Sequence, residues 1–291
     1  MSENLIDKSV WDNDELKRIV IDVNPTTNLI FKKLESRSER FDSNCEIIFG
    51  IKPYQVGYGV PKQSQEYVDK RIYHSSKSLG GGWFPLVTGT DVNRYSLDFK
   101  KDAYIKYGKW LMYFSNEGKI KNKKLLLRRT SSDLRVAFDD EEYYPQNSLF
   151  ILTSSKYNLK YLLAILNSRL FAYVYKNKCP QIGKIFAEVK PSIIKSLPIK
   201  EISFLDQLPL INNSDILLSL NKDLLEANHK FQRNIQRKFE LVELTAKLHN
   251  WYLFSYAEFI KELGKKKKNS HLLMKQNGKN TSSKNLKKPL T

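Results

Sequence analysis

Several short patterns in this sequence are of the kinds that carry nucleotide binding or catalysis. Residues 52–62, KPYQVGYGVPK, contain a Gly-x-Gly pair, which in dinucleotide-binding proteins begins a loop that cradles phosphates. Such a loop needs further glycines at fixed spacing and a following helix, whereas Pro61 comes almost immediately after this pair. We therefore interpret residues 52–62 as a stiff recognition loop on the surface and not as a nucleotide loop.

Two other patterns resemble catalytic motifs only in part. Glu188-Val189-Lys190 fits the Glu-x-Lys of nucleases that hold Mg²⁺, but a predicted helix separates it from the upstream acids at 139–142. Asn24-Pro25-Thr26-Thr27 lacks the second proline and the aromatic residue with which amino methyltransferases hold an extruded base. The four histidines are scattered along the chain. We therefore assign no catalytic residue, no metal site and no cofactor to this chain.

The charge of the chain predicts a polyanionic partner. Its 49 Lys and Arg against 31 Asp and Glu give a net charge of +18. Nine lysines and no acid lie in residues 265–291, which we expect to be a disordered basic tail. From Lys100 to Arg135, eleven basic residues face three acids and alternate with aromatic residues. Basic and aromatic residues interleaved in this way are typical of phosphate contacts beside base stacking, which favours nucleic acid.

Cysteine content and hydropathy indicate a cytoplasmic protein without a membrane segment. Cys45 and Cys179 lie far apart and suggest neither a disulfide framework nor a metal site. The polar N-terminus is not a signal peptide, and no apolar run approaches the ~20 residues that span a bilayer.

Hydrophobic periodicity predicts an α+β fold. We expect a helix over 24–41 capped by Asn24, a strand at CEIIFG, and a mixed or antiparallel sheet of short strands over 71–155. A single helix is expected over 158–176, and a long helix with a coiled-coil-like seam from about Ser214, with a short helix folded back on it. The predicted organisation is a helical lead (1–40), a target-recognition domain (41–205), a helical spacer (206–264) and the basic tail (265–291).

The order of motifs along the chain resembles one known family. GIKPYQVGYGVPK, WFPLVTGTDVNRYSL, KLLLRRTSSDLRVAF, YYPQNSLFIL, LKYLLAILNSRLFAYVY and LHNWYLFSYAEFIKEL are similar, in the same order, to the TaqI-like C-terminal specificity domain. We place this resemblance over about residues 25–265. The family supplies target recognition to bacterial type II restriction–modification enzymes with adenine-N6 methyltransferase cores.

The resemblance implies sequence-specific recognition of double-stranded DNA for a catalytic domain or subunit. A methyltransferase or nuclease partner would bring S-adenosylmethionine and Mg²⁺. The resemblance implies that the chain is a fragment, the product of a truncated gene, or a separate specificity polypeptide that works with a catalytic partner. A non-specific nucleic-acid-binding module and a protein-interaction module remain as alternatives. A non-specific module would bind all duplexes equally. A protein-interaction module would use the helices over 214–263 as its main surface for contact with the partner.

The DNA-binding candidates are basic, amide and aromatic residues of the basic stretches. Lysine and arginine suit phosphates or guanine, and glutamine suits adenine. We expect Arg128 and Arg129 to point to opposite faces of a strand, and Arg94 to pair with Asp91. Tyr54 is expected to pack or to stack. The candidates are Lys52, Tyr54, Gln55, Lys62, Gln63, Arg94, Lys106, Lys109, Lys123, Lys124, Arg128, Arg129 and Arg135.

Overall fold

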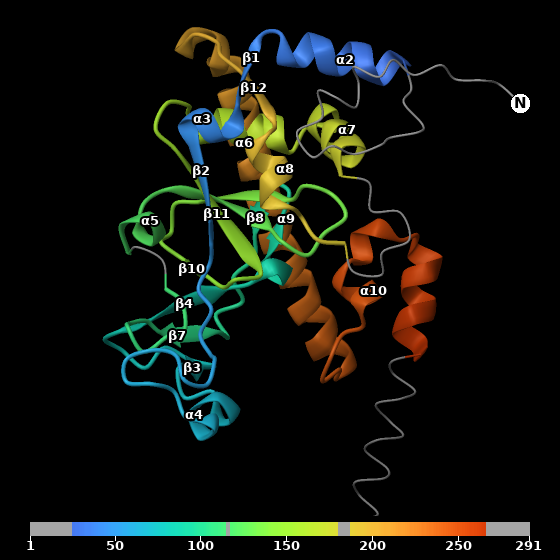
Figure 1. The fold of residues 1–291 in the computed structure, drawn as a ribbon. Coiled ribbons are helices and arrows are strands. Elements are labelled where there is room, and N and C mark those ends of the chain that lie inside the picture. Colours follow the sequence, from blue (N-terminus) through green and yellow to red (C-terminus); the bar gives the residue numbers. More distant parts are fainter. Residues whose placement is uncertain (1–24, 115–116, 180–186, 266–291) are drawn as a thin grey trace, which may run out of the picture. The chain divides into compact units, whose positions relative to one another are not determined.

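A computed structural model of the protein describes residues 25–114, 117–179 and 187–265 (Figure 1). The chain divides into two compact units, Met1–Leu218 and Ser219–Thr291. The predicted cap residue Asn24 and the predicted basic tail after Lys265 lie outside the described residues.

A four-stranded sheet of the first unit lies between two hydrophobic cores. It consists of β2 (Cys45–Phe49), β11 (Leu149–Ser154), β8 (Lys124–Arg128) and β9 (Val136–Asp139), in that order, with all pairs antiparallel. Side chains alternate across a strand, so Leu125 and Leu127 enter one core while Leu126 enters the other. The unbroken apolar run of β8 therefore reflects burial on both faces of the sheet.

Helices build the first core against one face of this sheet. They are α3 (Phe41–Asn44), α6 (Leu159–Leu166), α7 (Arg169–Lys178) and α8 (Pro191–Lys195). A ribbon of β1 (Ser38–Arg40) and β12 (Pro198–Lys200) pairs antiparallel, and α2 (Pro25–Glu35) packs Phe31 and Leu34 against the same core. Segments distant in sequence thus close one hydrophobic interior, whose burial stabilises the unit.

A second four-stranded sheet belongs to the other core. Its order is β10 (Tyr144–Pro145), β4 (Trp83–Val87), β7 (Tyr104–Lys106) and β3 (His74–Ser75), with β10 and β4 parallel and the other pairs antiparallel. The turn η1 (Gly89–Asp91), the two-stranded hairpin of β5 (Val92–Asn93) and β6 (Ser96–Leu97), and the helices α4 (Gln65–Lys70) and α5 (Glu117–Lys121) complete this region. Figure 1 shows β4, β7, β3 and α4 gathered at one end of the first unit.

The second unit is helical. The helix α9 (Phe204–Phe239) continues from the first unit into the second, where α10 (Ala246–His249), the turn η2 (Trp251–Leu253) and a helix over 256–265 follow. Ile235, Leu248 and Leu263 form its core, and the Phe231 ring lies 5.8 Å from that of Phe259. The predicted helix that folds back on the long helix is therefore confirmed.

The predicted α+β class, with a long C-terminal helix, is confirmed. The strands predicted at CEIIFG, KKLLLRRT, LRVAF and NSLFILTS correspond to β2, β8, β9 and β11. The long helix begins at Phe204, ten residues before the predicted start at Ser214, and contains Pro209. The predicted helix over 24–41 is shorter than expected, because α2 ends at Glu35 and the chain turns into β1.

The single helix predicted over 158–176 is wrong, because the chain breaks between α6 and α7. Asn167 leaves the helix and bonds Val136 of β9 twice, accepting from its backbone N–H at 3.1 Å and donating to its carbonyl at 2.9 Å. The hydroxyl of Ser168 then accepts from Phe171 N and caps α7. After this break, Leu170 of α7 is 44% exposed.

Candidate nucleic-acid interface

Three stretches of the first unit contain no Asp or Glu and lie side by side. They are residues 52–65, 70–90 and 103–114, and we call them the basic loop face. The backbones of Lys52 and Tyr113 exchange two hydrogen bonds of 2.9 and 3.0 Å. Val60 N donates to Lys109 O at 2.9 Å, Tyr107 N donates to Gly82 O at 3.1 Å, and β3 pairs with β7. Three separate acid-free segments therefore form one surface region.

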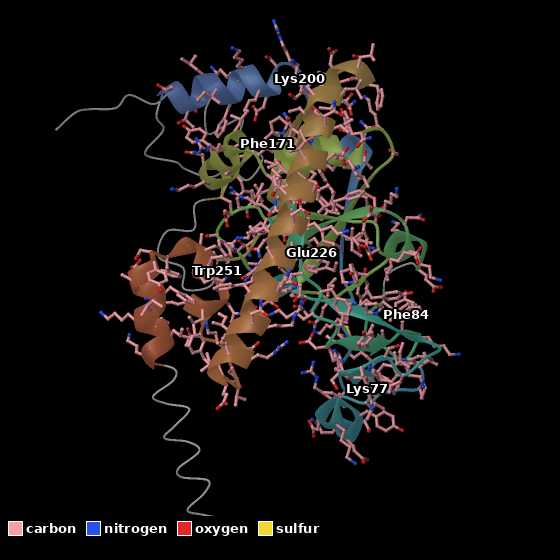
Figure 2. The ribbon with its side chains drawn as sticks, turned by 180° about the vertical axis from the view of Figure 1, so that it is seen from behind. Lys77, Phe84, Phe171, Lys200, Glu226 and Trp251 are labelled. Carbon is pink, nitrogen blue, oxygen red and sulfur yellow. The ribbon has the colours of Figure 1, made fainter. Side chains whose placement is uncertain are left out.

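The basic loop face carries seven cations, and almost all are available to an external anion. Among the described residues, only Lys70 of this set forms an ion pair, with Glu66 at 2.6 Å. Lys52 donates to Gln55 Oε1 at 2.8 Å, and the Lys106 ammonium lies 5.5 Å from the centre of the Trp110 ring. Lys62, Lys77 and Lys109 are exposed, and Figure 2 shows Lys77 beside α4 at the outer end of this region. Positive charge without local carboxylates attracts polyanions. The seven are Lys52, Lys62, Lys70, Arg71, Lys77, Lys106 and Lys109.

The opening loop is held in place by Gln63. This side chain is 2% exposed and donates from Nε2 to Pro53 O at 2.8 Å and to Trp110 O at 2.7 Å, while its Oε1 accepts from Gln55 N at 3.1 Å. The prediction that Gln63 reads bases is therefore wrong, because the buried amide is already used on both its nitrogen and its oxygen. Gly59 has φ +85°, and a Cβ there would lie 2.2 Å from Trp110 O, so this position requires glycine.

An aromatic group supports the loop from below. The Tyr54 ring stacks on Tyr73 at 5.7 Å, and its hydroxyl accepts from Tyr73 N at 2.8 Å and lies 3.0 Å from His74 Nδ1. Burial raises the pKa of Tyr54 to about 12. Burial also lowers the pKa of His74 to about 4, and the positive charge of Arg71 adds to that shift. Tyr54 thus packs beneath the loop, which is the first of the two roles predicted for it.

Lys124, predicted to contact DNA, is fully buried. It faces Asp139 across the β8–β9 pair, and the two side chains, each 0% exposed, form an ion pair of 2.7 Å. Lys124 also donates to Ile120 O. Burial lowers the pKa of Lys124 and raises that of Asp139, while each opposite charge counteracts the shift of its partner. The prediction for Lys124 is wrong because the sheet encloses its side chain.

Two predicted arginines, Arg94 and Arg135, bond the same carboxylate, that of Asp133. Arg94 pairs with Asp133 at 3.1 Å and not with Asp91 as predicted, because Asp91 Oδ2 accepts from Thr88 N at 2.7 Å to close η1. Arg135 bonds the same Asp133 at 3.2 Å. Burial alone would raise the pKa of Asp133, but the hydrogen bond from the Ser131 hydroxyl and the positive charges of the two arginines outweigh it, so the pKa is lowered. Arg94, in the turn of the β5–β6 hairpin, is thereby tied to Asp133 in the connection that precedes β9.

Arg128, the last residue of β8, and Arg129, which follows it, bond different partners. Arg129 bonds Glu188, and Arg128 donates to the nearby Thr130 O at 3.0 Å. Lys190 also reaches Glu188 at 3.3 Å, and the hydrogen bond from Arg129, followed by that from Lys190, holds the pKa of Glu188 below its usual range. The Glu188-x-Lys190 pattern therefore forms an ion-pair cluster. In the part of the chain that the structure describes, no group of three or more His, Cys, Asp or Glu is placed to hold a metal ion.

Sequence reasoning missed three cations of the basic loop face, Lys70, Arg71 and Lys77. The signal was present, since residues 70–90 hold three basic residues and no acid. The charge count was made over residues 100–135 instead. That range mixes the loop lysines Lys106 and Lys109 with the sheet residues around Lys124, so it did not point to residues 70–90. Lys123, at the start of that second group, is exposed.

The family models match two parts of the chain. Residues 84–199, less than half of the chain, match the model described as the TaqI-like C-terminal specificity domain. Residues 204–282 match a domain of unknown function (DUF8810). The TaqI-like match is shorter than the span of 25–265 inferred from motif order, and the opening loop lies before it.

Solved structures show weak similarity. One described as the structural basis of complex assembly and conformational transition of the type I R-M system is 12% identical, with 73% of this chain and 49% of that chain covered and a TM-score of 0.39. The HsdS subunit from Thermoanaerobacter tengcongensis is 13% identical, with coverages of 78% and 48% and a TM-score of 0.36. The type IIG restriction endonuclease BpuSI is 12% identical, with coverages of 65% and 28% and a TM-score of 0.43. This chain thus spans about half or less of each of these proteins.

Neither a curated relative nor, among the described residues, a membrane-spanning helix was found. No curated protein matches the chain. Within the described ranges, none of the helices combines the length and the apolar character needed to cross a membrane.

Proposed function

We propose, from the premise that residues 84–199 are a TaqI-like C-terminal specificity domain, that this chain selects the DNA site at which a restriction–modification enzyme acts. The observation that carries the proposal is the basic loop face. Three acid-free segments that are separate in sequence join to one another and to the sheet of the matched domain, through β4 and β7. A surface of this charge suits double-stranded DNA.

The loop face supplies both kinds of contact that a specificity domain needs. Lys62, Lys77 and Lys109 bind phosphates and set the register of the protein on the duplex. In this proposal the Lys52 ammonium and the Gln55 amide, which are joined by a hydrogen bond of 2.8 Å, read base edges, since lysine suits guanine and glutamine suits adenine. Loop packing under Gln63 fixes the direction in which these groups point.

The chemistry belongs, in this proposal, to a catalytic domain or subunit. An adenine-N6 methyltransferase with S-adenosylmethionine, or a nuclease with Mg²⁺, would act in the bacterial cytoplasm on DNA held by this chain. Extruding an adenine costs a few kcal/mol of unstacking, and a clamped duplex helps the partner to reach the base. The described residues of this chain contribute binding and orientation only.

A protein-interaction role is the second candidate, and α9 favours it. Leu220 and Leu224 are 58% and 42% exposed, although a coiled-coil-like seam on this helix would bury them. An apolar row of this kind on a helix is a docking surface for another helix. Under this reading, reversing charges on the loop face leaves function unchanged, whereas polar substitutions on α9 remove it.

Selection of bound duplexes from a random pool tests the proposal. The full chain is used alone and together with a cognate methyltransferase subunit. We expect one enriched sequence, and the same selection with Lys62→Glu and Lys109→Glu should lose it. Recovery of all duplexes equally, in both arms, contradicts sequence-specific recognition.

A further inference from the structure

The tip of the opening loop presents apolar side chains to solvent. Val56, Tyr58 and Val60 are 47%, 48% and 59% exposed, whereas the stacked rings of Tyr54 and Tyr73 lie below the loop. Exposed apolar groups gathered on one short segment favour contact with another molecule. Simple solvation of the loop does not account for them.

The loop is braced, so the tip keeps its shape. Gly57 N donates to Gln63 O at 3.0 Å, Gln63 N donates to Tyr58 O at 2.8 Å, and Val60 N donates to Lys109 O at 2.9 Å. The Gln63 side chain bonds Pro53 O and Gln55 N on the opposite edge of the loop, and the neighbouring Trp110 carbonyl. A tip that is already ordered loses little conformational entropy when it binds.

The charge around the tip decides what it contacts. Lys62 lies within the loop, Lys52 at its base, and Lys109 is bonded to it through the backbone, while residues 52–65 and 103–114 contain no acid. An acid-free ring of cations selects a polyanion over most protein surfaces. Since the phosphates of DNA are polar and its bases are the apolar part, an apolar tip between cations fits the base stack.

We propose that this loop is a wedge that enters the DNA at a base step, with Tyr58 stacking on an exposed base and Val56 and Val60 lining the gap. The inference rests on the proposed function, and it assigns to Tyr58 the further role of distorting the bound duplex. The lysines hold the two backbones on either side of the opened step. Distortion of this kind adds selectivity, because base steps differ in how easily they open.

Binding of the full chain to two short duplexes tests the wedge. One duplex has a central abasic site, and the other is fully paired and otherwise identical; fluorescence anisotropy gives both affinities. We expect roughly tenfold tighter binding to the abasic duplex, because the unstacking cost is absent there. Tyr58→Ala should bring this ratio close to one, and Tyr58→Phe, which keeps the ring, should preserve it.

Tyr67→Ala is the matched control. Tyr67 is 38% exposed on α4, next to the loop face but outside the loop, so its loss should leave the ratio unchanged. Thermal unfolding of each variant shows whether the fold is kept. Equal binding of both duplexes by the unchanged chain, or an unchanged ratio in Tyr58→Ala, overturns the wedge and points to a protein as the partner of the tip. Failure of the chain to bind either duplex sinks the proposed function as well.

Discussion

The lysines and arginines of the loop face differ from those of the four-stranded sheet in what surrounds them. Around the sheet, Lys124 pairs with Asp139, Arg135 with Asp133 and Arg129 with Glu188. On the loop face, Lys62, Lys77 and Lys109 form no ion pair within the described parts of the chain. The same residue types therefore serve the fold in one region and are available for binding in the other.

The difference follows from where acids lie in the sequence and how strands bring them together. The β8–β9 hairpin places Asp139 opposite Lys124, and Asp133 in its connection lies between two arginines. The loop segments have no acid to offer one another. Local acid content, measured segment by segment, thus separates the lysines of the loop face from the cations held in ion pairs better than net charge over a long window.

The largest expected effect concerns the buried pair. Lys124→Met leaves the Asp139 carboxylate buried without its counter-charge, and we expect a loss of about 3–5 kcal/mol in the free energy of unfolding. Urea denaturation measures this loss. Addition of Asp139→Leu should recover most of it, because the second substitution removes the stranded charge.

The folded fraction of Lys124→Met should bind DNA with unchanged salt dependence. A normal stability for Lys124→Met would contradict the burial of the pair. A reduced salt slope would instead place Lys124 among the binding cations and break the distinction between the two regions.

Sequence patterns predicted the strands well and the side-chain roles less well. Runs such as CEIIF and KLLLR are rich in apolar residues with high β propensity, so these strands can be predicted from the local sequence alone. The burial of Lys124 depends on Asp139 in another strand, and that of Gln63 depends on Trp110, so neither could be predicted from neighbouring residues. The break at Asn167 has the same cause, since its partner is the backbone of β9.

The candidate site was likewise predictable only in part. The opening loop and its lysines were identified from composition and from motif order. These lysines lie on one surface with Lys77 and Lys109 only because β3, β4 and β7 pair with one another. Those strands are two to five residues long. Short strands were predicted in this part of the sequence, but strands this short carry too little periodic signal for their pairing partners to be predicted.

The second prediction concerns acid and the support of the loop face. The pKa of His74 falls from 6.5 to about 4 on folding, chiefly through burial. Between these pH values the unfolded chain binds a proton that the folded chain does not, so stability decreases as pH falls from 6.5 to 4. The total loss is roughly 3 kcal/mol for a shift of this size. His74→Phe keeps a ring against Tyr54 and removes this contribution.

Urea denaturation at several pH values measures the difference between the two proteins. We expect the stability of His74→Phe relative to the unchanged protein to rise as the pH is lowered through this window. A constant difference would mean that His74 titrates normally and that the base of the loops is open to water.

The third prediction separates the two kinds of cation directly. Replacing Lys62, Lys77 and Lys109 by glutamine should weaken duplex binding on the order of a hundredfold at ~0.15 M salt and reduce the salt slope by about 0.9 for each phosphate that is no longer neutralised. Stability should change by less than about 0.5 kcal/mol, because these residues are exposed. Anisotropy titrations across a salt series give the affinity and the slope, and urea denaturation gives the stability.

A control with the same change in net charge uses paired lysines. Lys119, Lys121 and Lys156 bond Glu46, Glu117 and Glu39, and their replacement by glutamine should leave most of the affinity and the slope intact. Equal losses of affinity in the two triple variants would show that only total charge matters, and the distinction between loop face and sheet would fail.

The smallest effect is expected at Arg129, which lies between the two groups, since it is paired with Glu188 but its side chain is 33% exposed. Glu188→Gln keeps a hydrogen-bond acceptor and removes the charge that holds the guanidinium. Because the Glu188 side chain is 36% exposed, solvent screens the pair and the cost should be below ~1 kcal/mol. Because folding lowers the pKa of Glu188, its carboxylate stabilises the folded protein at pH values above 4.5, its ordinary pKa. This stabilisation is lost as the pH falls below 4.5, so the stabilities of the variant and the unchanged protein should converge in acid. DNA affinity should rise a few-fold at most, as expected when one carboxylate is removed. A rise well above tenfold would mean that Glu188 competes with phosphate for Arg129, and the binding surface would then extend from the loops onto the edge of the sheet.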